Sequence, residues 1–211
     1  MTKNNEDPNK MILLDEPVFL GNEEKYLMDC INSGFISWQG KYVTLFEELF
    51  TKYVQSKYGS STANGTSALI IALQALGIGK GDEVIVPTLT FSASAFAVTN
   101  VGANVVFADS LPNELNINPS EIEKNITSKT KAIMVVHLYG RPVNMDEIMR
   151  IAKKYNLYVV EDCAECLGAL YKDKKTGSFG DISCFSFHNK LIATGEGGMI
   201  VTKDESLFNR I

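Results

Sequence analysis

The sequence predicts an α/β fold in which a mostly parallel sheet lies between two layers of helices. Two features lead to this prediction. Short apolar runs rich in β-branched residues recur along the chain, as is typical of buried parallel strands. Segments with the apolar spacing of helices separate these runs, and this alternation is typical of three-layer α/β domains.

Two amphipathic helices are expected before the first of these strands. They cover residues 23–34 and 41–59, and the loop FISWQG at 35–40 joins them. We expect both helices to pack on the flank of the sheet or on another subunit. Residues 1–40 therefore form an N-terminal segment of helix and loop, and residues 41–211 form the main domain.

The middle of the chain carries the alternating pattern. Each expected strand ends in polar or turn residues. The last expected helix has Asn144 as its N-cap and basic residues toward its end. Strands are expected at 82–87, 103–109, 131–140 and 157–162, and helices at 65–77, 90–102 and 144–156.

The end of the sequence adds two short strands, at 183–188 and 198–204, on either side of a glycine cluster. A helix is expected to begin at 205 and is cut off at 211, which suggests a truncated polypeptide. No internal repeat or low-complexity linker divides the chain, so one domain is the simplest count.

Composition and charge exclude several classes of protein. The 211 residues are 45% apolar, enough for a substantial core, and the net charge is −5. No basic cluster is longer than KDKK at 172–175, so nucleic acid is not an expected partner. The polar, acidic start is unlike a signal peptide and the apolar runs are too short for a membrane span, so a cytoplasmic protein is expected. Its four cysteines are expected to be reduced thiols.

Ligands of such sheets bind beside the carboxyl ends of the strands, and four segments place polar or reactive side chains there. The first is ANGTSA at 63–68, which opens a helix. Gly65 permits close approach of a ligand, and Thr66 and Ser67 offer amides and hydroxyls at the positive end of the helix dipole, which favours phosphate. An ordinary helix N-cap is the alternative.

The second and third segments offer an aromatic ring and two carboxylates. Phe91 follows the strand at 82–87, where it could stack on a planar ring or belong to the core. Glu161 and Asp162 end a buried strand, where a carboxylate needs a cationic partner. That partner is either a neighbouring lysine or helix N-terminus, or a protonated heterocyclic nitrogen.

The fourth segment is FSFHNKLIATGEGG at 185–198, in which Ser186 and Lys190 lie among aromatic residues and glycines. Most lysines are solvated, but burial in an apolar turn favours a neutral amine and Schiff-base chemistry. Together the four segments supply a phosphate seat, a stacking ring, a carboxylate for a ring nitrogen and a reactive amine. Pyridoxal 5'-phosphate needs this combination, and no metal is expected.

Several motifs also resemble those of a known family, the DegT/DnrJ/EryC1/StrS sugar aminotransferases, and within it are most similar to the perosamine synthase-like branch. The resemblance runs from about residue 12 to the end. It implies the large domain of a fold-type I, aspartate aminotransferase-like enzyme, with an active site at a homodimer interface. The segments that carry it are ANGTSALIIALQALGIGKGDEVIVPTLTFSAS, VHLYGRPVNMDEI, EDCAECLGALYKDKKTGSFGDISCFSF and NKLIATGEGGMIV.

The resemblance implies roles for individual residues of a domain that binds pyridoxal phosphate at 41–211. Lys190 resembles the Schiff-base lysine, Asp162 the partner of the pyridine nitrogen and Phe91 the stacking ring. Glu165 occupies the position that faces the phenolic oxygen, where the family often has glutamine or histidine. The residues that resemble phosphate contacts are Gly65, Thr66, Ser67 and Ser186.

The implied reaction is a ping-pong transamination that supplies amino sugars for surface polysaccharides or glycans. Glutamate is the expected donor, and the acceptor is a nucleotide-linked keto-deoxysugar that receives the amine at carbon 4. The sequence departs from the family in two ways. It has one residue fewer between FSF and NK, and it does not include the family's C-terminal small domain. The alternative is therefore a truncated, catalytically impaired member that binds the cofactor weakly or serves as an interaction fragment.

Three rival interpretations are weaker. GIGKGD at 77–82 has neither the spacing nor the position of a dinucleotide-binding fingerprint. The motif CAEC at 163–166, together with His137 or His188, suggests a zinc or redox site. A single pair of cysteines supplies only two of the four ligands of a structural zinc site, so buried thiols are expected instead. The dehydratase offshoot of the family has histidine at the position of Lys190. His137, Tyr139 and Trp38 remain open between lining the site and packing.

Overall fold

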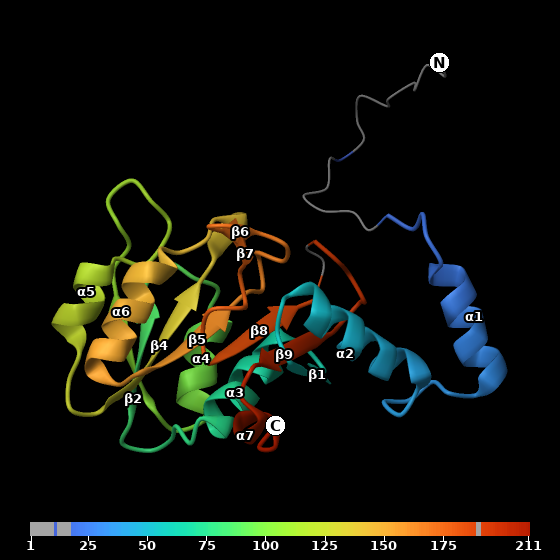
Figure 1. The fold of residues 1–211 in the computed structure, drawn as a ribbon, viewed down its shortest axis with the longest axis horizontal. Helices are drawn as coiled ribbons and strands as arrows, with labels where there is room; N and C mark the ends of the chain where they lie inside the picture. The colour runs from blue at the N-terminus through green and yellow to red at the C-terminus, as the bar shows by residue number, and fades with distance from the viewer. Residues whose placement is uncertain (1–10, 12–17, 189–190) are drawn as a thin grey trace, which may run out of the picture.

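A seven-stranded sheet forms the centre of the chain (Figure 1). The structure is a computed structural model and describes residues 11, 18–188 and 191–211. β9 is antiparallel to both of its neighbours and the pairs from β8 to β3 are parallel, which confirms the predicted mostly parallel sheet. The strands lie in the order β1 (Tyr58–Thr62), β9 (Gly198–Thr202), β8 (Ile182–Ser186), β5 (Tyr158–Asp162), β4 (Thr130–Val136), β2 (Glu83–Pro87) and β3 (Asn104–Ala108).

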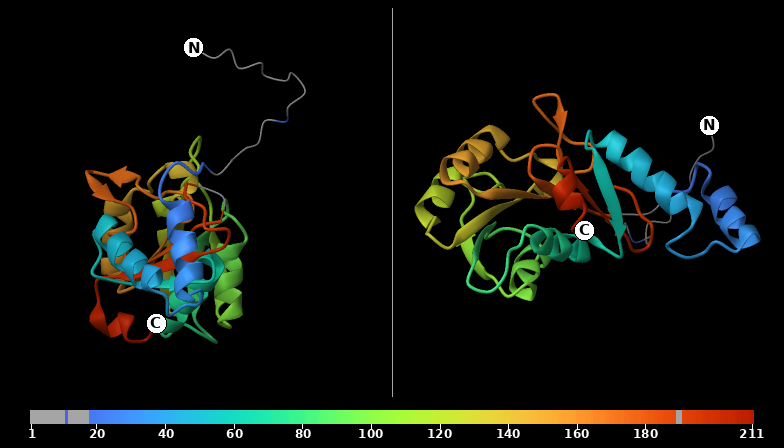
Figure 2. Two further views of the ribbon diagram at one scale, coloured as in Figure 1. Left: turned by 90° about the vertical axis from the view of Figure 1, so that its right-hand side faces the viewer. Right: turned by 60° about the horizontal axis from the view of Figure 1, so that its bottom comes forward.

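Helices cover both faces of the sheet, so the predicted three layers are present (Figure 2). One hydrophobic cluster joins the first face to α3 (Gly65–Ala75), α4 (Ala93–Asn100) and α7 (Glu205–Phe208). Two further clusters join the opposite face to α2 (Lys41–Tyr53), α5 (Pro119–Asn125) and α6 (Met145–Tyr155).

The sequence of β4 shows why the sheet is buried on both sides. Ala132 and Met134 belong to the cluster beneath α3 and α4, whereas Ile133 and Val135 belong to the cluster beneath α5 and α6. Side chains of a strand alternate between faces, so a continuous apolar run fills both cores. Burial of each large side chain stabilises the fold by about 1.5–3 kcal/mol.

Aromatic packing fixes the carboxyl end of β8. Phe50 of α2 meets the rings of Phe185 and Phe187 edge to face, with centroid distances of 4.9 and 5.3 Å. Such pairs add about 0.5–1.5 kcal/mol beyond the area they bury. The strand end that carries Ser186 therefore has a rigid support.

The first predicted helix is present as α1 (Glu23–Ser33), and it ends at Gly34 in the left-handed conformation, with φ of 74°. No residue of α1 is buried, and Figure 1 shows it beyond α2, away from the sheet. Asp29 ties it to α2 through Lys41 at 2.5 Å and the Tyr42 hydroxyl at 2.8 Å. The division of the chain at residue 40 stays a prediction.

The second predicted helix, 41–59, is wrong beyond Tyr53, where α2 ends. Residues 58–62 instead form β1, the edge strand that pairs with β9. Gly59 lies so close to α2 that a Cβ there would be 2.3 Å from Oγ1 of Thr51. Tertiary pairing and this close approach, rather than local propensity, determine the strand.

The predicted strand at 131–140 ends at Val136, because residues 138–140 form a 3-10 turn (η1, Leu138–Gly140) in which Tyr139 has φ of 49°. Besides β1, the helix α5 and a short hairpin were not predicted. α5 begins after Asn118, whose side chain caps the helix by accepting a hydrogen bond from the amide of Ser120. The hairpin joins β6 (Leu170–Tyr171) to β7 (Lys174–Lys175).

None of the described helices has the length and hydropathy of a membrane span.

Candidate active site

A cavity of about 440 Å³ opens where the carboxyl ends of β4, β5 and β8 meet the N-terminus of α3. Its volume is in the range of small-molecule sites. Ser67 is not among the lining residues, and Lys190 lies outside the described residues. Six of the eight residues assigned to the site from the sequence line the cavity: Gly65, Thr66, Phe91, Asp162, Glu165 and Ser186.

The N-terminus of α3 forms one wall of the cavity. Asn64 is its N-cap, and its side chain accepts a hydrogen bond of 2.9 Å from the amide of Ser67. The amide of Ser67 is therefore used within the helix cap, as the alternative interpretation of this segment expects, and the phosphate seat stays a prediction. A Cβ on Gly65 would lie 2.7 Å from the Cβ of Ser186, so only glycine lets β8 approach the helix start this closely.

Asp162 closes the inner wall at the end of β5, with 6% of its surface exposed. Its Oδ2 accepts a hydrogen bond of 2.8 Å from the Ser94 hydroxyl, and its Oδ1 accepts one of 3.1 Å from the Ala164 amide. Ser94 is in turn 2.9 Å from the Thr90 hydroxyl. These bonds fix the orientation of a carboxylate that lines the cavity.

Glu161 points to the opposite face of the sheet and has a structural role. Its carboxylate accepts hydrogen bonds from the His137 ring and the Ser183 hydroxyl. Burial raises the pKa of Glu161, but the bonds from His137 and from backbone amides give a net decrease. The amides that donate to it belong to Gly177, Phe179 and Gly180.

His137 lies in the core rather than in the cavity. Its Nε2 is 3.1 Å from Oε2 of Glu161, and its Nδ1 accepts a hydrogen bond of 3.0 Å from the amide of Val143. Burial lowers the pKa of His137 and the Glu161 carboxylate raises it, with a net increase. A second proton on Nδ1 would break the bond from Val143, so this geometry holds a neutral ring with its proton on Nε2.

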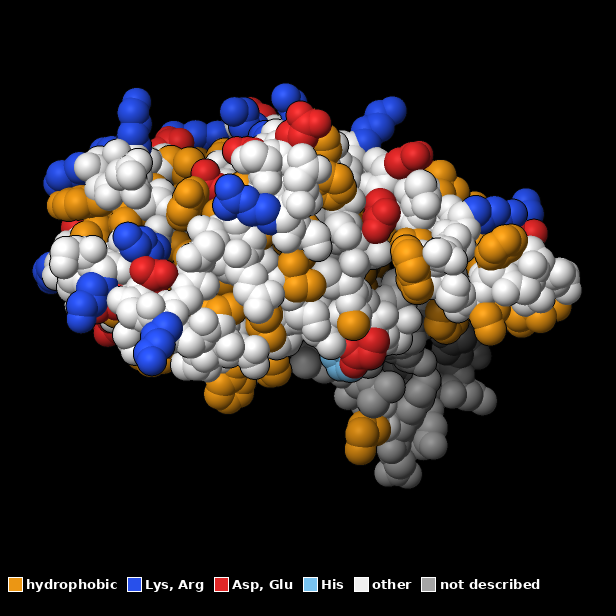
Figure 3. Space-filling view, turned by 90° about the horizontal axis from the view of Figure 1, so that it is seen from below, with side chains coloured by type: hydrophobic (Ala, Val, Ile, Leu, Met, Phe, Trp, Pro, Cys, Tyr) orange, Lys and Arg blue, Asp and Glu red, His pale blue; other side chains and the backbone are white. Residues whose placement is uncertain are grey.

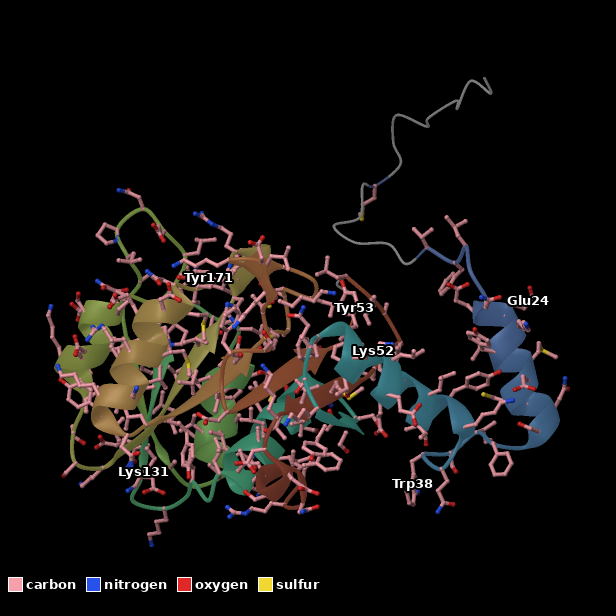
Figure 4. All side chains as sticks on the ribbon, in the orientation of Figure 1. Glu24, Trp38, Lys52, Tyr53, Lys131 and Tyr171 are labelled. Atoms are coloured by element: carbon pink, nitrogen blue, oxygen red, sulfur yellow. The ribbon has the colours of Figure 1, made fainter. Side chains whose placement is uncertain are left out.

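The outer part of the cavity carries Phe91 and Glu165. Phe91 is 69% exposed, so it is not the core residue of the alternative interpretation. Oε2 of Glu165 accepts a hydrogen bond of 3.1 Å from the Tyr139 amide. Trp38 is 78% exposed, and Figure 4 shows it on the loop between α1 and α2, pointing away from the sheet.

Several lining residues were missed in the sequence. Nδ1 of His188 lies 3.0 Å from Oε1 of Glu196 at the rim, on the segment that also carries Lys190. Ser94 does not line the cavity but holds the lining residue Asp162 from the buried side of α4, and no local signal in the sequence marks this contact. Cys184 alternates with Ser186 on β8, which predicts a shared face.

The CAEC motif lies beneath the cavity wall. The sulfur atoms of Cys163 and Cys166 and a ring nitrogen of His137 are all within 4.8 Å of one another, and all three residues are buried. Both nitrogens of His137 already have hydrogen-bond partners, so a role as a metal ligand would require the bond at one of these nitrogens to break. The cysteines are buried thiols, as the sequence predicts.

Known proteins are similar to this chain over most of its length. The model of the DegT/DnrJ/EryC1/StrS aminotransferase family matches residues 20–211. The chain is 50% identical over 202 residues to the GDP-perosamine synthase of Escherichia coli O157:H7, covering 95% of this chain and 56% of that protein.

Two solved structures are similar to the fold. An aminotransferase from Psychrobacter cryohalolentis matches with a TM-score of 0.88 and 46% identity, over 92% of this chain and 50% of that one. Spr1654 of Streptococcus pneumoniae, in its PLP-form, matches with a TM-score of 0.88 and 30% identity, over 94% of this chain and 56% of that one. The chain thus spans about half the length of the proteins it matches.

Proposed function

This chain belongs to the DegT/DnrJ/EryC1/StrS aminotransferase family, and we propose that it is the cofactor-binding part of a sugar aminotransferase. The cofactor is pyridoxal phosphate. The amino group moves from an amino acid, glutamate, to carbon 4 of a nucleotide-linked keto-deoxysugar. The observation that carries the proposal is one cavity lined both by a buried, oriented Asp162 and by the N-terminus of a helix.

The described residues fit pyridoxal phosphate. The cavity of about 440 Å³ has room for one small aromatic ring with a phosphate arm. The approach of Gly65 to Ser186 leaves backbone amides and a hydroxyl beside the start of α3, an arrangement that binds anions. Asp162 supplies the negative charge that a protonated ring nitrogen needs in a buried place.

Each residue of the site then has a defined task. Asp162 holds a proton on the ring nitrogen, while the Ser94 hydroxyl and the Ala164 amide hold Asp162 in place. When bound, pyridoxal phosphate supplies a protonated aromatic ring that accepts electron density from the carbon that carries the amino group. Phe91 covers one side of the cavity and limits the access of water.

Lys190 is proposed as the residue that holds the cofactor aldehyde and moves a proton through its Nζ. Its position lies outside the described residues, so this assignment rests on the family motif NKLIATGEGG. Glu165 and Ser67 are proposed cofactor contacts on the same basis. Glu165 lines the cavity, whereas Ser67 contributes through the cap that orders the start of α3.

A homodimer and a cytoplasmic location are further parts of the proposal. Phe91 and Tyr139 are 69% and 77% exposed beside the cavity, and a second subunit would cover such apolar surface. Hydrophobic side chains also lie exposed along α1, at the right-hand end of Figure 3. A nucleotide sugar as acceptor is supported by the relative that is 50% identical, which is a GDP-perosamine synthase.

Absorbance spectroscopy tests the proposal. The purified chain with added pyridoxal phosphate should develop a visible band that decays when glutamate is added. A nucleotide-linked 4-keto-6-deoxysugar should then restore the band, and NMR of the product should place the amine on carbon 4. Asp162→Asn should abolish the decay, whereas the exposed control Glu147→Gln should retain it.

The alternative function is that of a family member that binds the cofactor without turnover. A band that persists with glutamate would support this alternative. Absence of any band under saturating cofactor would contradict both functions.

A further inference from the structure

Cys163 and Cys166 are placed to react with each other. The amide of Cys166 donates a hydrogen bond of 3.3 Å to the carbonyl of Cys163, so residues 163–166 form a tight turn, in which the Cα atoms of the first and last residues lie within about 7 Å. The two sulfur atoms are within 4.8 Å. Disulfides need Cα atoms about 4.4–6.8 Å apart, so a bond requires only a small rearrangement of this turn.

The two thiols differ in reactivity. A hydrogen bond from the Cys163 thiol lowers the pKa of Cys166 against the effect of burial, and Sγ of Cys166 also lies 3.2 Å from Oγ1 of Thr176, to which the thiol donates. Burial raises the pKa of Cys163 well above its ordinary value, and the neighbouring Cys166 adds to the increase. Cys166 is therefore the attacking thiolate and Cys163 the resolving thiol.

The turn between these cysteines is also part of the cavity wall. Ala164 donates its amide to Asp162 Oδ1, and Glu165 accepts a hydrogen bond from the Tyr139 amide. Both Ala164 and Glu165 line the cavity. A covalent bond between the residues that flank them changes the positions of both.

We propose that Cys163 and Cys166 form a reversible disulfide in the folded chain, and that this bond reshapes the cavity wall at Ala164 and Glu165. The Cys166 thiolate attacks a small disulfide such as oxidised glutathione and releases one glutathione thiol. The Cys163 thiol then loses its proton, attacks the sulfur of Cys166 and displaces the second glutathione. The two cysteines are oxidised, and one glutathione disulfide is reduced to two glutathione thiols.

Alkylation and mass spectrometry of the native chain test the disulfide. Both cysteines fall in one tryptic peptide, residues 155–172, because no lysine or arginine lies between Lys154 and Lys172. After incubation with oxidised glutathione, this peptide should be lighter by two hydrogen atoms and should resist alkylation until a thiol reductant is added. Cys30, which is half-buried on α1, should react faster, since buried sulfur atoms require local opening.

Two single variants, each in a Cys30→Ser background, separate the steps. Cys163→Ala should trap a glutathione adduct on Cys166, because the resolving thiol is absent. Cys166→Ala should leave Cys163 as a free thiol. If oxidised glutathione oxidises Cys30 of the original chain but leaves two alkylatable thiols in the 155–172 peptide, the proposal is overturned. A transition metal bound in stoichiometric amount by the reduced chain would also overturn it.

The effect on the cavity rests on the proposed function. Oxidation should raise the Kd for pyridoxal phosphate by about tenfold or more, because a hydrogen bond to the charged Asp162 is weakened. Equal Kd values for the reduced and oxidised chain would overturn this part. If the reduced chain fails to bind the cofactor, the proposed function fails, whereas the thiol analysis still decides the disulfide.

Discussion

Ser94 Oγ donates a hydrogen bond of 2.8 Å to Asp162 Oδ2, and this bond connects α4 to the end of β5 across 68 sequence positions. Ser94 is fully buried. Water therefore cannot reach the Ser94 hydroxyl and take the place of Asp162 as its partner. The bond fixes one carboxylate oxygen of Asp162 toward α4. The orientation of the cavity carboxylate depends on a residue of a different element.

Replacement of Ser94 by alanine should weaken the binding of pyridoxal phosphate by about tenfold or more, because a buried hydrogen bond to a charged group is worth about 1.5–3 kcal/mol. Fluorescence titration with the cofactor measures the change. Ser92→Ala is the matched control, since Ser92 is exposed on the same helix start and makes no capping hydrogen bond through its side chain. Equal losses in the two variants would contradict the role of Ser94.

Gly65→Ala should reduce cofactor affinity by about tenfold or more, since the added Cβ would lie 2.7 Å from the Ser186 Cβ and force the phosphate seat apart. The same titration measures the effect. Gly79→Ala is the control, because its Cβ would meet its nearest neighbour at an ordinary 3.6 Å. If Gly65→Ala binds the cofactor as tightly as the original chain, the phosphate does not lie at the start of α3.

Lys190→Ala should abolish the visible absorbance band of bound pyridoxal phosphate, because no other amine is proposed to hold the aldehyde. Lys131→Ala should keep the band, since Lys131 is exposed on β4 and lies at the lower edge of the molecule in Figure 4. An unchanged spectrum in the Lys190 variant would assign the aldehyde to a different residue.

The site could be located from the sequence because of a rule of topology. The carboxyl ends of parallel strands meet at one edge of a sheet, so Gly65, Asp162 and Ser186 were expected together and do line one cavity. Local patterns also predicted the helix capped by Asn144. These features depend on short-range periodicity and on strand direction.

Long-range contacts explain what the sequence did not show. The bond from Ser94 to Asp162 and the pairing of β1 with β9 join segments far apart in the chain, and no local signal marks either. Alternation along β5 implied that Glu161 and Asp162 face opposite ways. It could not show which face holds the cavity, nor that backbone amides and His137 surround Glu161.

The carboxylate of Glu161 has its native hydrogen bonds only while it is ionised. Its folded-state pKa is lowered below the ordinary value of 4.5. A carboxyl group with a lowered pKa contributes stability that is fully present above pH 4.5 and is lost as the pH falls through the folded-state value. The free energy of unfolding should therefore decrease in acid partly because of this one residue.

Glu161→Gln should lower the free energy of unfolding at pH 7 by at least about 1–3 kcal/mol, because the amide nitrogen cannot accept a hydrogen bond and leaves buried donors without an acceptor. Urea denaturation followed by circular dichroism measures this change. Glu147→Gln on the exposed surface of α6 removes the ion pair with Arg150 and should cost less than about 1 kcal/mol. The carboxyl ¹³C shift of Glu161 in the original chain gives the titration directly, even if the variant fails to fold. A midpoint above 4.5 would contradict the assignment.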